Sequence, residues 1–269
     1  MIDSTAQAHQ QDQKDARLSE LWSPPRLFVA AIGILAGVVI YLVGLPSSTS
    51  IFGTPLSDLT LPVALFVGGA VVAVAASTAV AGRWRIVDIV VASVLGVAGG
   101  LVFSVWNAST QPLRASMVPL VGATIVGVWL FPAVLGGLIV RRPGAAVYTE
   151  LVAAVLSALV GNEWGFATVW YGLVEGLGAE VVFALLLYRR YGLPTALLAG
   201  AGAGVAVGLL DSLIYYPAVL DPAGRLAYVA IATCSGVIIA GLGSWALTKA
   251  LAKTGTLAPM ASGRAAERV

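Results

Sequence analysis

Three glutamates lie inside apolar stretches of this 269-residue chain, where a carboxylate is an unusual and chemically informative group. Glu150, Glu175 and Glu180 fall between two arginine pairs, at positions 141–142 and 189–190. A charge at that depth is expensive in hydrocarbon, so each carboxylate must be paired, neutralised or directed into a cavity. These three side chains are the first candidates for function.

The composition shows which solvent surrounds these residues. Hydrophobic residues make up 59% of the chain and charged residues only 10%, with a mean hydropathy of +0.93, which is typical of a protein embedded in a bilayer. Long unbroken apolar runs separated by short polar joints indicate helices rather than the alternating strands of a barrel. The sequence predicts an all-α, polytopic membrane helical bundle.

Several classes of enzyme lack the residues they would need. The single histidine, His9, lies in the polar N-terminal tail, and the single cysteine, Cys234, lies in an apolar run where a packing role is expected. The sequence has no H-E-x-x-H, no G-x-S-x-G and no G-x-x-x-x-G-K-[ST] phosphate loop. We therefore expect no catalytic residues, no metal site and no cofactor, and we expect any energy coupling to come from other chains.

Four segments follow from the pattern of apolar runs. We expect a polar cytoplasmic tail at 1–26, an N-terminal transmembrane helix pair at 27–82, a six-helix core at 83–253 and a cytoplasmic C-terminal tail at 254–269. The predicted spans are 27–45, 60–82, 86–105, 117–140, 145–160, 165–188, 194–216 and 226–248. The first two spans carry no charge, and a continuous eight-helix bundle is the alternative to this division.

The basic residues predict the orientation. If the N-terminus is cytoplasmic, 13 of the 15 lysines and arginines lie inside, and only Arg114 and Arg225 lie outside. This distribution follows the positive-inside rule. We expect a multi-pass protein of the cell membrane with both termini in the cytoplasm.

Small residues form a stripe on the first core span. Ala92, Gly96 and Gly100 recur at intervals of four, which places them on one helix face where another helix can approach closely. Internal packing and a docking surface for a partner subunit are equally compatible with this stripe.

Two further features concern packing within the bundle. Gly200, Gly204 and Gly208 form a similar stripe, for which internal packing is the preferred interpretation. Pro132, in the middle of a predicted span, is expected to kink that helix and free a carbonyl.

Polar and aromatic side chains gather toward the predicted outer side. Trp164, Thr168, Tyr171 and Glu175 follow at steps of four, three and four, so they share one helix face. At ~1.5 Å per residue, Glu175 lies about 15 Å below the outer end of its helix, near the midplane. Other spans end on the same side, and the predicted substrate-binding residues are Trp106, Asn107, Asn162, Trp164, Thr168, Tyr171, Glu175, Asp211 and Tyr215.

Such a set of acids, amides and aromatic rings suits a cationic, aromatic, hydrogen-bonding solute. The alternative for any single tryptophan or tyrosine near a helix end is membership of the interfacial aromatic belt. Glu150 and Glu180 lie nearer the cytoplasm. They are expected to be buried charges that pair with the arginines or couple to a partner.

One long segment resembles a known family. The run RRPGAAVYTELVAAVLSALVGNEWGFATVWYGLVEGLGAEVVFALLLYRRYG, preceded by WRIVDIVVASVLGVAGGLVFSVWN and by GVWLFPAVLGG, is similar to the YkoE family. These proteins are substrate-binding S components of energy-coupling factor (ECF) vitamin transporters. The similarity covers residues 83–253, whereas residues 1–82 have no counterpart in the family pattern.

The resemblance implies a six-helix S component that captures thiamine or its hydroxymethylpyrimidine (HMP) precursor from outside. It implies partners on other chains, namely a transmembrane coupling subunit and ATPase subunits, with docking through small residues of the first core helix, here Ala92, Gly96 and Gly100. The family pattern often has Gln before its second G-L-G, where this chain has Glu175.

Two other functions remain open at this point. An ion- or proton-coupled secondary transporter of another small solute would also bury carboxylates, although the internal two-fold repeat that would support it is not evident. A membrane scaffold that transports nothing would need no cavity, and all of its glutamates would be paired with arginines.

Overall fold

The computed structural model describes residues 50–51, 54–55, 84–114, 117–165, 167–260 and 262–263. The predicted N-terminal tail and helix pair lie outside the described residues, apart from the two-residue strands β1 (Ser50–Ile51) and β2 (Thr54–Pro55), which pair antiparallel. The last residues of the predicted C-terminal tail also lie outside them. The fold described below is therefore that of the predicted core.

Six helical segments make up this core. They are α4 (Ile86–Arg114); α5 (Pro119–Gly122), the 3-10 helix η2 (Ala123–Val128) and α6 (Phe131–Val140); α7 (Ala145–Val160); α8 (Ala167–Leu185); α9 (Leu193–Leu210) with the π-helical η3 (Asp211–Tyr215); and α10 (Pro222–Ser235), the π-helical η4 (Gly236–Leu242) and α11 (Gly243–Lys253). Five segments are long and apolar enough to cross a membrane, and α7 is a shorter apolar helix. The all-α membrane class is confirmed, and the segments coincide with the six predicted core spans.

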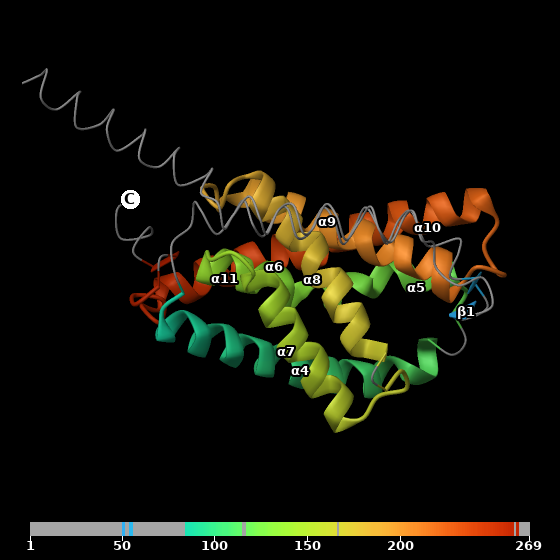
Figure 1. The fold of residues 1–269 in the computed structure, drawn as a ribbon, viewed down its shortest axis with the longest axis horizontal. Helices are drawn as coiled ribbons and strands as arrows, with labels where there is room; N and C mark the ends of the chain where they lie inside the picture. Colours follow the sequence, from blue (N-terminus) through green and yellow to red (C-terminus); the bar gives the residue numbers. More distant parts are fainter. Residues whose placement is uncertain are drawn as a thin grey trace, which may run out of the picture.

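Helices α4, α9 and α10 run roughly along the long axis of the molecule, whereas α7 and α8 cross it obliquely (Figure 1). Helix α7 packs between α4 and α8, and α9 packs against α8, α10 and η4. Helix α4 begins beside the C-terminal end of α11 and runs to the opposite end of the molecule (Figure 1). Its outer face is apolar and exposed along its length, as expected for a helix in contact with lipid, with residues such as Val90, Val94 and Leu101.

The small-residue stripe of α4 is covered by α7. Ala92 is fully buried, and a Cβ atom added to Gly96 would lie 2.8 Å from the carbonyl oxygen of Thr149. A Cβ atom on Gly100 would lie 2.7 Å from the carbonyl oxygen of Ala153. The stripe therefore serves internal packing, and a partner helix could reach these residues only by displacing α7, so docking of a partner through them stays a prediction.

The second stripe packs internally, as expected. A Cβ atom on Gly204 would lie 2.7 Å from the carbonyl oxygen of Ala232, and one on Gly208 would lie 2.9 Å from the Cα atom of Val229. Gly200 is similarly close to the backbone of Gly236. The absence of side chains lets α9 lie directly against α10 and η4.

The predicted irregularity at Pro132 is a change of helix type. Pro132 lies in the first turn of α6, which follows the 3-10 helix η2 and a turn, rather than in the middle of one bent helix. The N–H of Ala133 at this break donates to Oε2 of Glu150 at 2.7 Å. A side chain of α7 therefore satisfies a backbone donor that the interrupted helix leaves without its usual acceptor.

Candidate ligand-binding site

A cavity of about 270 Å³ lies between α4, η2, α8, α9 with η3, and α10. Apolar residues supply part of its wall, including Phe103, Val126 and Val207. Its polar and aromatic lining comprises Arg114, Trp129, Glu163, Trp164, Thr168, Tyr171, Glu175, Asp211, Tyr215, Tyr216 and Tyr228. Such a cavity, apolar with a few converging polar groups, is the usual form of a small-molecule site.

Helix α8 and the turn before it contribute one line of side chains to the cavity. Trp164, Thr168, Tyr171 and Glu175 all line it, so the predicted shared face is the face that the structure directs inward. On another face of α8, Gly172 lies so near α7 that an added Cβ would be 2.6 Å from Cβ of Ala154. This close packing of α8 on α7 supports the wall.

Asp211 lies where α9 changes into the π-helical turn η3. Its Oδ2 accepts a hydrogen bond from the Tyr228 hydroxyl at 2.6 Å, and its carboxylate also interacts with the Tyr171 hydroxyl and with Glu175. In the part of the chain that the structure describes, no basic side chain contacts Asp211 or Glu175. This end of the cavity, which we call the carboxylate end, is a place where a cationic or hydrogen-bond-donating ligand would be stabilised.

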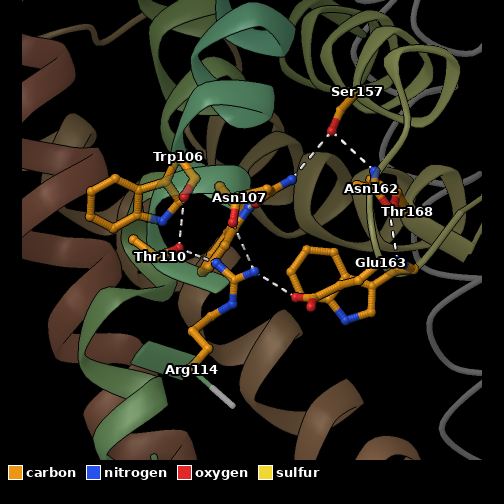
Figure 2. A network of polar contacts seen from close by, with 10 residues as sticks. Trp106, Asn107, Thr110, Arg114, Ser157, Asn162, Glu163 and Thr168 are labelled. Atoms are coloured by element: carbon orange, nitrogen blue, oxygen red, sulfur yellow. Dashed lines mark hydrogen bonds and ion pairs between the residues drawn. The ribbon is translucent and has the colours of Figure 1, made fainter. Parts of the chain in front are cut away.

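The other end of the cavity, which we call the arginine end, is formed by Arg114 and Glu163 (Figure 2). Nη2 of Arg114 donates to Oε1 of Glu163 at 2.5 Å. The guanidinium carbon of Arg114 lies 5.5 Å from the ring centre of Trp129 and 4.9 Å from that of Trp164. Both distances are within the range of a cation–π interaction.

Three predicted binding residues do not line the cavity but support it from behind. Asn107 accepts a hydrogen bond from Nε1 of Trp129 at 2.9 Å, and Trp106 packs edge-on against Trp129 with ring centres 6.5 Å apart. Asn162 accepts from the backbone N–H of Trp164 at 2.9 Å and from the Thr168 hydroxyl at 3.1 Å. These side chains orient cavity-lining residues, and Figure 2 shows Asn162 beside one of them, Thr168.

The same network joins α4 to α7 and to the turn before α8. Nδ2 of Asn107 donates to the Ser157 hydroxyl at 3.4 Å, and Nδ2 of Asn162 donates to the same hydroxyl at 3.1 Å (Figure 2). The arginine end is therefore held by hydrogen bonds between elements that are distant in the sequence.

Five residues of the polar and aromatic lining named above were not among the predicted binding residues. Trp129, Tyr216 and Tyr228 are aromatic, and Arg114 and Glu163 form the ion pair. Arg114 did carry a signal, because it is one of two exceptions to the positive-inside distribution.

Glu180 and Glu150 are buried away from the cavity lining. Oε1 of Glu180 accepts from the N–H of Gly144 at 2.6 Å and from the Tyr188 hydroxyl at 2.5 Å, and its Oε2 accepts from the N–H of Ala146 at 2.9 Å. The carboxylate thus caps the N-terminus of α7, where the helix dipole favours a negative charge. The expected pairing with arginine is replaced by this contact with backbone amides.

Glu150 lies between the break in the second core span and the cavity. Its Oε2 accepts from Ala133, whereas its Oε1 is buried without a hydrogen-bond partner. It is near enough to Glu175 for the two carboxyl groups to interact electrostatically. Like Glu180, it contacts a backbone amide and no arginine in the described residues.

Two arginines at the end of the bundle opposite the cavity, Arg85 and Arg142, pair with a different acid. Asp88, which is fully buried, forms ion pairs with Arg85 at 2.7 Å and with Arg142 at 3.1 Å. Arg85 also donates to the carbonyl oxygen of Pro259, beyond α11. This cluster ties the start of α4 to the loop before α7 and to the segment after α11.

Comparisons with known proteins show which proteins this chain resembles. Residues 87–206 match the family model described as ABC-type cobalt transport system, permease component. A protein of Bacillus subtilis (strain 168), named as an HMP/thiamine permease protein, YkoE, is 34% identical over 181 residues, which are 67% of this chain and 91% of that protein. A solved structure described as an S-component of an ECF transporter has a TM-score of 0.66 and 33% identity, and the match covers 69% of this chain and 94% of the other.

Proposed function

We propose that this chain, which belongs to the YkoE family of ECF transporter S components, captures thiamine or HMP from outside the cell. S components bind substrate and catalyse no reaction, so the relevant property of this chain is its cavity. The observation that carries the proposal is the carboxylate end, where Glu175 and Asp211 meet the rings of four tyrosines inside a membrane bundle.

The chemistry of both ligands suits this end of the cavity. Thiamine has an aminopyrimidine ring and a positively charged thiazolium ring, and HMP has the aminopyrimidine ring alone. Carboxylates accept hydrogen bonds from the ring amine and stabilise a nearby cation, and tyrosine faces stack on either ring. A curated relative named as an HMP/thiamine permease protein supports the same choice of ligands.

The proposal includes partners and an orientation. A transmembrane coupling subunit and ATPase subunits on other chains would drive ATP-dependent release inside the cell. The arginine end would face outward, both termini would be cytoplasmic, and residues 83–253 would form the S component, with residues 27–82 as an added helix pair. The positive-inside distribution supports this orientation.

Calorimetric titration of the purified full-length protein with thiamine and with HMP tests the binding step. We expect saturable binding of at least one of them, strongly weakened in Glu175→Ala. Asp221→Asn is the matched control, because Asp221 is an exposed cap of α10 and asparagine retains the capping oxygen. Binding of neither ligand by the wild-type protein would refute the substrate assignment.

Transport in vesicles tests the energy source. We expect uptake only when the coupling and ATPase subunits and internal ATP are present. Uptake by this chain alone under a proton gradient would instead support the secondary-transporter alternative.

A further inference from the structure

The arginine end already contains a cation in the position where tryptophan rings would attract one. The guanidinium of Arg114 is within 6 Å of the ring centres of both Trp129 and Trp164. The two rings are nearly perpendicular, with centres 6.0 Å apart, so a single cation lies near both. A positively charged ligand group would compete with Arg114 for this position.

Several contacts hold Arg114 there, although they do not satisfy it completely. Its guanidinium donates to Glu163, to the Thr110 hydroxyl and, at 3.4 Å, to the carbonyl oxygen of Asn107. Its Nε is buried without a hydrogen-bond partner. The side chain of Arg114 is 13% exposed and that of Glu163 is 36% exposed, so the arginine is the inner member of the pair.

We propose that Arg114 and Glu163 determine the charge selectivity of the cavity by occupying its outer cation position with an internal ion pair. The inference rests on the proposed function and concerns the choice between cationic and neutral ligands. With the pair intact, the arginine end adds no net charge, and among the described lining residues only the carboxylate end offers a ligand cation an acid without a basic partner.

Charge arithmetic predicts opposite effects for the two residues. Removing the charge of Arg114 leaves Glu163 negative, which strengthens the binding of a cation in the same low-dielectric cavity. Removing the charge of Glu163 leaves Arg114 positive, which weakens the binding of a cation. Neither change alters the electrostatic energy of a bound neutral ligand. Any change in the shape of the cavity affects the affinity for both ligands alike.

The test is the ratio of the HMP dissociation constant to the thiamine dissociation constant, measured by calorimetry at pH 7.5. HMP is neutral and thiamine is cationic under these conditions. We expect Arg114→Gln to raise the ratio by about threefold or more and Glu163→Gln to lower it by a similar factor. The double variant should return the ratio toward its wild-type value, and Arg114→Lys should leave it nearly unchanged.

The ratio separates this inference from its alternatives, because a general disturbance of the cavity cancels in it. Equal weakening of both ligands in Arg114→Gln, with an unchanged ratio, would reduce Arg114 to a structural role and overturn the inference while leaving the proposed function intact. Shifts of the ratio in the same direction in both single variants would overturn it as well. Binding of neither ligand by the wild-type protein would remove the proposed function and this inference together.

Discussion

The two ends of the bundle treat buried carboxylates in opposite ways. At the cavity, Glu175 and Asp211 have hydroxyl groups and each other as neighbours, with no arginine among the described residues. At the opposite end, Glu180 is surrounded by backbone amides and a tyrosine hydroxyl, and Asp88 by two arginines. All four acids are buried, so the hydrogen-bond donors around each one decide whether it stabilises the fold or can bind a ligand.

The largest expected effect on stability comes from removing Glu180, the acid that accepts hydrogen bonds from two backbone amides and a tyrosine hydroxyl. Glu180→Ala leaves the amides of Gly144 and Ala146 and the Tyr188 hydroxyl without their acceptor in a buried place. We expect a loss of about 3 kcal/mol or more in the free energy of unfolding, measured by denaturation in detergent. Glu180→Gln retains one acceptor oxygen, so its free energy of unfolding should fall by less than that of Glu180→Ala. A stability equal to wild type in Glu180→Ala would break the comparison.

The cavity acid should show the reverse pattern. Glu175→Ala removes a buried carboxylate that no strong donor satisfies, so we expect the free energy of unfolding to change by less than about 1 kcal/mol. Ligand affinity should fall by about 2 kcal/mol, or roughly thirtyfold in the dissociation constant. Paired unfolding and calorimetric measurements on one preparation check both expectations. A large loss of stability with unchanged affinity would place Glu175 in the same class as Glu180.

A smaller effect is expected at the arginine-bound acid. Asp88→Asn removes the charge that Arg85 and Arg142 share, and we expect a loss of about 1–2 kcal/mol because both arginines are partly solvated. The difference between variant and wild type should shrink when salt is raised from 50 mM to about 1 M, because salt screens the wild-type pairs. An effect that does not depend on salt would indicate that hydrogen bonds, rather than charge, hold this cluster.

The smallest effect sharpens the role of Glu180. Tyr188→Phe removes one of its donors and leaves the backbone amides in place, so we expect a loss of about 1 kcal/mol in the free energy of unfolding. Combining this change with Glu180→Ala should cost less than the sum of the two, because both remove the same hydrogen bond. Full additivity in this double-mutant cycle would show that the two side chains act independently.

Features with a local cause were predictable from the sequence. Five of the core spans follow from apolar runs of membrane length and the span of α7 from a shorter apolar run, and the shared face of Trp164, Thr168, Tyr171 and Glu175 follows from the helical repeat. Close packing at Gly204 followed in the same way from its spacing and size. These properties depend only on neighbours within one helix.

The tertiary structure decided what faces each of these surfaces. Arg114 and Glu163 are 49 positions apart and belong to different elements, so no spacing rule could pair them. The same holds for Glu180 with the amides that begin α7. The stripe containing Gly96 was equally suited to a partner or to α7 until the packing of the helices was known. The sequence by itself determined which residues share a helix face, because the helical repeat is local, whereas only the packing of separate helices determined the partner of each face.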